Sequence, residues 1–287
     1  MNKIYLNNYN FLCEVLFESA ELFNLVRNSE FWKVYSPDLH MTTEILKPDF
    51  QIFVDSKFIE VSIFNNVLQI PSENILPEDV ITIVDYVYEA QRNANGIYTL
   101  NSSVCVYQDL EGIIFFGGST AMGKTTLVRY MSSEDNFSMY SDDKVLIDLN
   151  NLKIINGSKY IHLNKTSLIT EFNETKDHVV LKDDKNNNNI KISLFVYGYL
   201  TPSFSEHEIW SKEKFVWHIY EAVTKRIRGV TRRINNGLLA LPSLDTQALS
   251  RKRIIDIHNL CDNVQCLFIK GSSENITSVV KDKLLHK

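Results

Sequence analysis

The chain has few of the features that mark secreted or membrane-spanning proteins. Its four cysteines, Cys13, Cys105, Cys261 and Cys266, are scattered and form no C-x-x-C pair. This spacing argues against a disulfide framework and suits a reducing compartment. No apolar stretch reaches the ~18 residues that a spanning helix needs, and the polar start at residues 1–4 lacks the apolar core of a signal peptide. We therefore expect a cytoplasmic protein with no membrane partner.

The chain also has too few basic residues for a broad nucleic-acid interface. Its 30 Lys and Arg residues stand against 35 Asp and Glu residues, which gives a formal net charge of -5. Nucleic-acid binding calls for a wide basic surface, so we expect no nucleic-acid partner. The seven histidines show no metal-ligand spacing. The content of 44% hydrophobic and 23% charged residues is ordinary for a globular protein that buries a core.

No linker rich in proline, glycine or serine divides the chain, and the sequence has no internal repeat. Residues 1–98 are predicted to form a small α+β region, and residues 99–287 a larger domain. In the first region, Pro77–Asp79 opens a helix that Gly96 closes, and Asn65-Asn66 predicts a hairpin turn. The other elements expected there are strands at 11–17, 50–54, 58–64 and 67–70 and a helix at 21–34.

The most informative feature is the run Gly118–Thr125, which reads G-S-T-A-M-G-K-T and fills the phosphate-binding pattern G-x-x-x-x-G-K-[ST]. Glycines let backbone N–H groups turn toward a polyphosphate, Lys124 reaches the outer phosphates, and the Thr125 hydroxyl ligates Mg²⁺. An apolar strand at 112–116 precedes the run and a helix follows it, as this motif requires. The expected nucleotide-binding residues are Gly118, Ser119, Thr120, Ala121, Met122, Gly123, Lys124, Thr125 and Thr126.

The strand that enters this loop is predicted to form a hairpin with the segment 103–108. The short turn at 109–112 makes the two strands antiparallel neighbours, because a parallel connection needs a crossover of about a dozen residues. Most P-loop proteins enter the loop from a parallel sheet, so this entry is unusual. Farther along, we expect a hairpin from 178–182 and 190–197, helices at 213–234, 245–260 and 274–285, and a strand at 265–269.

Two adjacent carboxylates, Asp142 and Asp143, supply what a P-loop needs to complete a metal site. They follow an apolar segment, 18 and 19 positions after Lys124. One can hold Mg²⁺ while the other accepts the proton of an attacking hydroxyl. In a strand the two side chains would point to opposite faces, so we expect the pair at a strand end where the backbone turns. A solvated acidic turn is the alternative.

The hairpin into the P-loop, the acid pair in Y-S-D-D-K-V-L-I-D and the helical C-terminus resemble the HPr kinase/phosphorylase family and its relatives. These relatives include kinases of lasso-peptide tails, and the fold is akin to that of ATP-dependent phosphoenolpyruvate carboxykinase. The resemblance covers about residues 99–287 and implies an α/β P-loop domain with a mixed sheet and C-terminal helices. It also implies ATP- and Mg²⁺-dependent phosphorylation of a serine-type hydroxyl, with Asp142 as base and Asp143, beside Thr125, on the metal.

The chain departs from this family at several positions. The family loop commonly reads G-x-S-G-x-G-K-[ST], whereas this chain has Thr120 and Ala121 in place of the Ser-Gly pair. Asn101 takes the place of a histidine that many relatives carry before the first hairpin strand, and asparagine does not titrate near neutral pH. The N-terminal region shows no sign of the sensor domain that accompanies the phosphocarrier kinases.

A basic cluster at 225–233 supplies further candidates. Arginine binds phosphate oxygens bidentately, and we favour Arg228 and Arg232 as groups that stabilise the transferring phosphoryl group. A solvated helix face is the alternative. The expected partner is a peptide or protein with an acceptor hydroxyl. A small-molecule hydroxyl kinase and a nucleotide-sensing module without catalysis stay open, as does the oligomeric state, with a homo-oligomer among the options.

Overall fold

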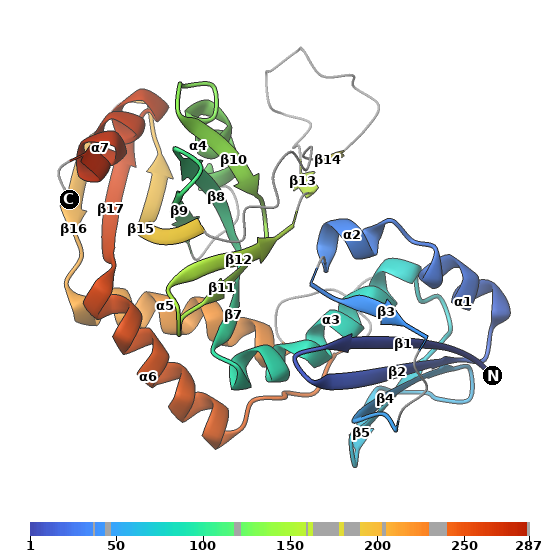
Figure 1. Cartoon of the computed structure of the whole chain (residues 1–287). Coiled ribbons are helices and arrows are strands. Elements are labelled where there is room, and N and C mark those ends of the chain that lie inside the picture. The colour runs from blue at the N-terminus through green and yellow to red at the C-terminus, as the bar shows by residue number, and fades with distance from the viewer. Residues whose placement is uncertain are drawn as a thin grey trace. The chain divides into compact units, whose positions relative to one another are not determined.

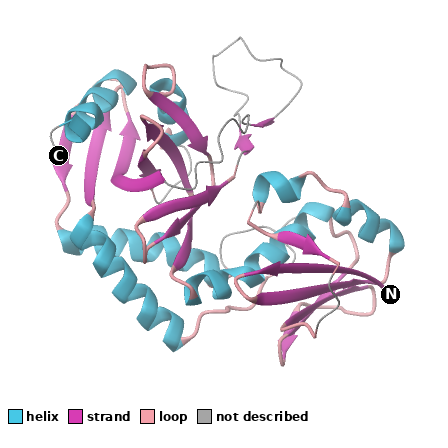
Figure 2. Ribbon diagram, viewed as in Figure 1, coloured by secondary structure: helices cyan, strands magenta, loops and turns pink. Residues whose placement is uncertain are grey.

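The computed structural model describes residues 1–36, 38–43, 47–117, 122–158, 160–162, 178–180, 190–202, 205–229 and 240–285. The chain is a mixed α/β protein (Figure 2). It divides into two compact units, one of Met1–Gly96 with Val223–Lys252 and one of Ile97–Ala222 with Arg253–Lys287. Each unit has its own mixed β-sheet (Figure 1). The sequence offered no sign that residues 223–252 belong with the first unit.

The first unit is a six-stranded sheet with the order β3-β1-β2-β4-β6-β5. Its strands are β1 Asn2–Asn8, β2 Phe11–Phe17, β3 His40–Thr42, β4 Phe50–Asp55, β5 Ser62–Phe64 and β6 Val67–Pro71. Its first three helices are α1 Ala20–Arg27, α2 Phe31–Tyr35 and α3 Pro77–Ala94. The core joins α3 to the sheet, with Val80, Ile81 and Val84 of the helix in one cluster with Val15, Ile52 and Ile70.

The hairpin predicted at Asn65-Asn66 is confirmed, because both residues have left-handed φ angles of 48° and 61° and β5 pairs antiparallel with β6. The strand predicted at 58–64 is wrong in its first half, since β5 begins only at Ser62. The single helix predicted at 21–34 is also wrong. The Val26 carbonyl, which a continuous helix would offer to the residue-30 N–H, instead accepts from the Trp32 indole at 2.8 Å.

A buried charge cluster fixes α3 within the first unit. The Arg92 guanidinium is fully buried, and its Nη2 atom lies 2.9 Å from Asp38 Oδ2 and 2.6 Å from Asp85 Oδ1. Its Nη1 atom lies 3.0 Å from Glu89 Oε1. All three carboxylates are less than one-tenth exposed, so a single guanidinium is the shared ion-pair partner of three carboxylates that have little contact with water.

The Tyr86 hydroxyl on α3 contacts several described residues of the segment 223–252. The Tyr86 Oη atom lies 2.9 Å from the carbonyl oxygen of Ile227 and 2.6 Å from that of Pro242, and it accepts from the Leu244 N–H at 3.2 Å. The Leu244 N–H also donates to the Ile227 carbonyl at 3.0 Å. The Tyr86 hydroxyl therefore holds Ile227 and Leu244 beside each other.

The second unit is a nine-stranded sheet whose main path runs β10-β8-β9-β15-β12-β11-β7, with β17 between β15 and β16. Its strands are β7 Ile97–Leu100, β8 Ser102–Tyr107, β9 Glu111–Phe116, β10 Phe137–Ser141, β11 Val145–Asp148, β12 Lys153–Gly157, β15 Ile190–Leu200, β16 Glu206–Ile209 and β17 Gln265–Gly271. Its helices are α4 Lys124–Met131, most of α5 Lys212–Ile227, most of α6 Gln247–Asn263, and α7 Ser273–Leu285.

The hairpin predicted before the P-loop is confirmed, because β8 and β9 pair antiparallel from Ser102↔Phe116 to Tyr107↔Glu111. β9, β15 and β17 then run parallel (Figure 1). Leu127, Val128 and Met131 of α4 join Ile276 and Val280 of α7 in one core cluster with these strands. The P-loop therefore follows the end of β9 and leads into the start of α4.

The later elements were predicted with mixed success. The strand at 265–269 and the helix at 274–285 are confirmed by β17 and α7. The hairpin from 178–182 and 190–197 is wrong, because β14 (His178–Val180) pairs with β13 (Tyr160–His162) and β15 is parallel to β9. The tip predicted at 183–189 lies outside the described residues. In the described part of the chain, no helix is both long and apolar enough to cross a membrane.

We expect Arg92→Ala to lower the free energy of unfolding by about 3–5 kcal/mol, because it leaves buried carboxylates without their cation. Chemical denaturation of the purified chain measures this. The control is Lys33→Ala, whose ion pair with Glu30 is exposed on both sides, and its effect should stay within about 0.5 kcal/mol. Equal effects of the two substitutions would contradict the importance of the Arg92 cluster.

Candidate functional site

Only the second part of the P-loop lies within the residues that the structure describes. Gly118, Ser119, Thr120 and Ala121 lie outside the described residues, whereas Met122, Gly123, Lys124, Thr125 and Thr126 are described. β9 ends at Phe116 and α4 begins at Lys124, so the strand, loop and helix follow one another as predicted.

Gly123 is the one described loop position where glycine is required by the backbone. Its φ angle is +84°, in the left-handed region, and it is the N-cap of α4. A Cβ at this position would lie 2.4 Å from Leu200 Cδ1 at the end of β15. The Leu200 N–H donates to the Met122 carbonyl at 3.3 Å. The end of β15 thus holds the second half of the loop in place, so that Lys124 and Thr125 begin α4 beside it.

The acid pair lies at a strand end where the backbone turns, as predicted. β10 ends at Ser141, and Asp143 has a left-handed φ angle of +59°. The Asp142 N–H donates to the Ser158 carbonyl at 3.2 Å, and the Ser158 N–H donates to the Lys144 carbonyl at 2.8 Å. These two bonds attach the turn to the end of β12.

Gly157 permits this close approach of β12 to the turn. A Cβ on Gly157 would lie 2.5 Å from Ser141 Cβ and 3.0 Å from the Lys144 carbonyl oxygen, which is closer than side-chain carbons pack. A larger residue at 157 would therefore push the acid turn away from its place.

The structure brings Thr125 and Asp142 into direct contact. Thr125 Oγ1 lies 2.9 Å from Asp142 Oδ1 and 3.0 Å from Oδ2. The Ser103 hydroxyl on β8 also donates to Asp142 Oδ1. Asp142 is 1% exposed, so its carboxylate is held by hydroxyl groups in place of water. The end of β10, the start of α4 and β8 meet at this side chain.

Ser103 is a site residue that the sequence did not single out. It lies next to Asp142 because β8 pairs antiparallel with β10, with Val104 opposite Ser141. These strands are separated along the chain by β9, the P-loop and α4. No local pattern predicts such a pairing, so nothing in the sequence marked Ser103.

Burial shifts the pKa values of Asp142 and Lys124 in opposite directions. Burial and the neighbouring Asp143 charge raise the pKa of Asp142, and the hydrogen bonds from Ser103 and Thr125 only partly offset this. Burial lowers the pKa of Lys124, against the charges of Asp143 and Asp142, which raise it. The site therefore holds an ammonium and two carboxylates in mutual electrostatic contact.

The donor set fits Mg²⁺. A threonine hydroxyl and carboxylate oxygens are the hard ligands that this ion prefers, and Mg²⁺ is commonly held by one or two carboxylates together with substrate phosphates. Among the described residues, no group of three or more His, Cys, Asp or Glu side chains could hold a metal ion without such help. The arrangement suits a metal that arrives with a polyphosphate.

The basic cluster is described only in part, and Arg232 and Arg233 lie outside the described residues. Arg228 is half-exposed in the first unit, with its Nε atom 3.4 Å from Asp245 Oδ2. Surface pairs of this kind contribute about 0–1 kcal/mol, so the guanidinium is easily released for another anion. A contact of Arg228 with the transferred phosphate stays a prediction.

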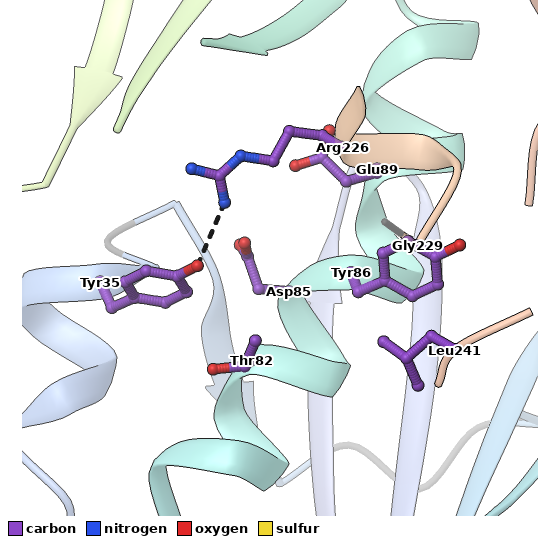
Figure 3. A pocket seen from close by; sticks show the side chains of 8 residues that line it. All are labelled: Tyr35, Thr82, Asp85, Tyr86, Glu89, Arg226, Gly229 and Leu241. Carbon is purple, nitrogen blue, oxygen red and sulfur yellow. Dashed lines mark hydrogen bonds between the residues drawn. The ribbon is translucent and has the colours of Figure 1, made fainter. Parts of the chain in front are cut away.

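Arg226 is committed to a different contact. It donates to the Tyr35 hydroxyl at 3.2 Å and lines a small cavity with Asp85 and Glu89 (Figure 3). Burial lowers the pKa of Arg226, but Tyr35, Glu89 and Asp85 outweigh this and raise it above its ordinary value. The cavity has a volume of about 30 Å³, enough for a water molecule or two and far below the ~300 Å³ of a small-ligand pocket. It is not the nucleotide site.

The chain matches no known family model, and no curated protein matches its sequence. The geometry of the loop, the acid turn and Ser103 therefore carries the functional argument, and the resemblance to HPr kinases stays a prediction from the motifs.

The raised pKa of Asp142 predicts a pH-dependent stability of the metal-free protein. Between the ordinary value of 3.8 and the raised one, the folded state binds the proton more tightly than the unfolded state, so stability falls as pH rises through this window. Asp142→Asn removes the titrating group. We expect the stability of the asparagine variant relative to wild type to increase with pH across the window, as measured by denaturation in chelator-treated buffer. A relative stability that decreases with pH would contradict the raised pKa.

Proposed function

We propose that the second unit is an ATP- and Mg²⁺-dependent kinase that transfers the γ-phosphate to a hydroxyl group. The observation that carries the proposal is the hydrogen bond between Thr125, directly after the P-loop lysine, and the buried Asp142. A P-loop threonine in contact with a carboxylate at a strand end is the arrangement that holds Mg²⁺ on a nucleotide. The antiparallel entry of β8 and β9 supports a domain of the HPr kinase and phosphoenolpyruvate carboxykinase type.

In this proposal the segment 118–126 binds the phosphates. Its backbone N–H groups and the N-terminus of α4 face the polyphosphate, where the helix dipole favours negative charge. The Lys124 ammonium would neutralise the outer phosphates, and the nearby Asp143 and Asp142 charges oppose the lowering of its pKa by burial. The bound Mg²⁺ would supply further neutralisation of the polyphosphate charge, held by Thr125 and the acid pair.

The reaction proposed is an in-line phosphoryl transfer in which positioning and charge neutralisation supply most of the acceleration. One carboxylate of the acid pair orients the acceptor hydroxyl and takes its proton. The resemblance gives this task to Asp142 and the metal to Asp143. Arg228 and Arg232 are candidates for stabilising the transferring phosphoryl group.

The acceptor proposed is a serine hydroxyl of a peptide or protein, on the strength of the resemblance alone. A small-molecule hydroxyl kinase would use the same phosphate and metal residues with a different acceptor pocket. A nucleotide-sensing module would need the P-loop without the acid pair, so the two classes differ in whether function is lost when either aspartate is replaced.

We expect wild-type protein to bind ATP with Mg²⁺ in calorimetry and to add one phosphate to a peptide encoded beside its gene, seen by mass spectrometry. Lys124→Ala should weaken ATP binding by about 10- to 100-fold and reduce transfer at least as much, because a charged hydrogen bond to phosphate contributes about 1.5–3 kcal/mol.

The matched control is Lys191→Ala, which removes an exposed lysine from the opposite end of β15, far along the strand from Leu200. It should bind ATP as wild type does. ATP binding that survives Lys124→Ala unchanged would rule out the P-loop as the nucleotide site.

A further inference from the structure

The strand β5 (Ser62–Phe64) forms one edge of the sheet in the first unit (Figure 1). Within the described part of the chain it pairs with β6 alone, and the side of β5 that faces away from β6 is its free edge. Proteins commonly blunt such edges with charged side chains or proline, because an edge offers unpaired backbone groups to other chains. β16, at an edge of the second sheet, carries Glu206 and Glu208. β5 carries neither a charge nor a proline.

The turn between β5 and β6 determines which backbone groups of β5 point outward. Asn65-Asn66 is a two-residue turn, and such a turn closes on a hydrogen-bonded pair, here Phe64 and Val67. Hydrogen-bonded and non-hydrogen-bonded pairs alternate along an antiparallel ladder, so the next pair, Ile63 and Leu68, is not hydrogen-bonded. The N–H and C=O groups of Ile63 therefore point away from β6, toward the free edge.

Two strongly exposed apolar side chains accompany this edge. Ile59 is 95% exposed and Phe64 is 76% exposed, and among the described residues no other large apolar side chain is as exposed. Ile59 precedes β5 by three residues, and Phe64 is the last residue of the strand. Side chains alternate along a strand, so Phe64 lies on the opposite face from Ile63, whose partner Leu68 belongs to the core. A strand added beside β5 would bring side chains against the Phe64 ring.

We propose that the free edge of β5 docks an extended peptide, which adds to the sheet through the Ile63 backbone and places an apolar side chain against Phe64. Main-chain hydrogen bonds hold such a peptide, and its alternate side chains give specificity. The docked segment and the acceptor serine are separate parts of one peptide, so docking raises the effective concentration of the acceptor. That the peptide is a substrate rests on the proposed kinase function, whereas docking itself needs no nucleotide.

The length of the edge favours a peptide over a second copy of the chain. The three residues of β5 span only about 10 Å. Pairing two copies of β5 would join two segments of this length, whereas a specific stable interface involves about 20–30 residues a side and buries about 1,200–2,000 Å². A substrate peptide has to leave after each turnover, so a short and weak contact suits it.

Ile63→Pro tests the docking strand most directly. Proline removes the N–H that points to the free edge and its ring obstructs an incoming strand, while the bonds between β5 and β6 are kept. Ile63→Val is the conservative variant that keeps the N–H. Phe64→Ser removes the exposed ring. Its matched control is Met41→Ser, which removes a 41% exposed side chain from β3 at the opposite edge of the same sheet.

Docking is measured on the full chain without nucleotide, by fluorescence anisotropy of labelled peptides encoded beside the gene. We expect Ile63→Pro to raise both the Kd and the KM for the peptide at least about fivefold, and Phe64→Ser about 3- to 10-fold. The KM for ATP and kcat at saturating peptide should stay within about twofold of wild type. Ile63→Val and Met41→Ser should bind the peptide as wild type does.

Hydrogen exchange followed by mass spectrometry locates the docked peptide. The peptide should slow exchange in the segment 60–66 of the wild-type chain, because the outward N–H of Ile63 becomes hydrogen-bonded, and it should not do so in Ile63→Pro. Unchanged peptide affinity in Ile63→Pro would overturn the docking strand and leave the kinase function standing. If Ile63→Pro does not fold, equal effects of Phe64→Ser and Met41→Ser on the Kd would overturn it.

The remaining outcomes separate the docking strand from the kinase. A peptide that binds at β5 without being phosphorylated would support docking and contradict the proposed function. A dimer that is seen by light scattering and abolished by Ile63→Pro would make this edge an interface between two copies, against the proposal. If the wild-type chain neither binds nor phosphorylates any of these peptides, the docking strand and the proposed peptide acceptor fall together.

Discussion

The hydrogen bond from Thr125 to Asp142 joins parts of the second unit that are remote along the chain. Thr125 belongs to the first turn of α4, whose start is set by Gly123 against Leu200. Asp142 belongs to the turn after β10, whose place is set by Ser158 and by the missing side chain of Gly157. If either support moved by an ångström, the hydroxyl and the carboxylate would no longer meet. The chemistry proposed for the site depends on this contact, because a metal ion shared by two ligands needs both at once.

The first unit depends on a different kind of constraint. Arg92 forms ion pairs with three buried carboxylates, and the Tyr86 hydroxyl contacts both Ile227 and Leu244. Buried ion clusters add little net stability compared with apolar packing, yet they tolerate no loss of a member. The half-exposed Arg228 follows directly after Ile227, held by a weak surface pair.

The local features of the fold could be predicted, and the long-range ones could not. The hairpin of β8 and β9 followed from a short turn, the β5–β6 turn from Asn65-Asn66, and the strand-end position of the acid pair from the period of two along a strand. The helix predicted at 21–34 is divided into α1 and α2, and the Trp32 indole, six residues along the chain, donates to the Val26 carbonyl. The 178–197 hairpin failed because β15 found parallel partners across the sheet.

The residues of the candidate site were likewise predictable only in part. Lys124, Thr125 and the two aspartates could be named from motifs, because phosphate and metal chemistry restricts which residue types occur at which spacing. Ser103, Ser158 and Gly157 could not, since their importance arises only when β8, β10 and β12 lie around the acid turn.

The most direct test is a crystal structure of the full chain with Mg²⁺ and a non-hydrolysable ATP analogue. We predict the polyphosphate on the backbone of the P-loop and the Lys124 ammonium, with the metal ion beside the Thr125 hydroxyl and the Asp142 carboxylate. A nucleotide bound elsewhere, or a metal ion far from both Thr125 and the acid pair, would contradict the kinase site.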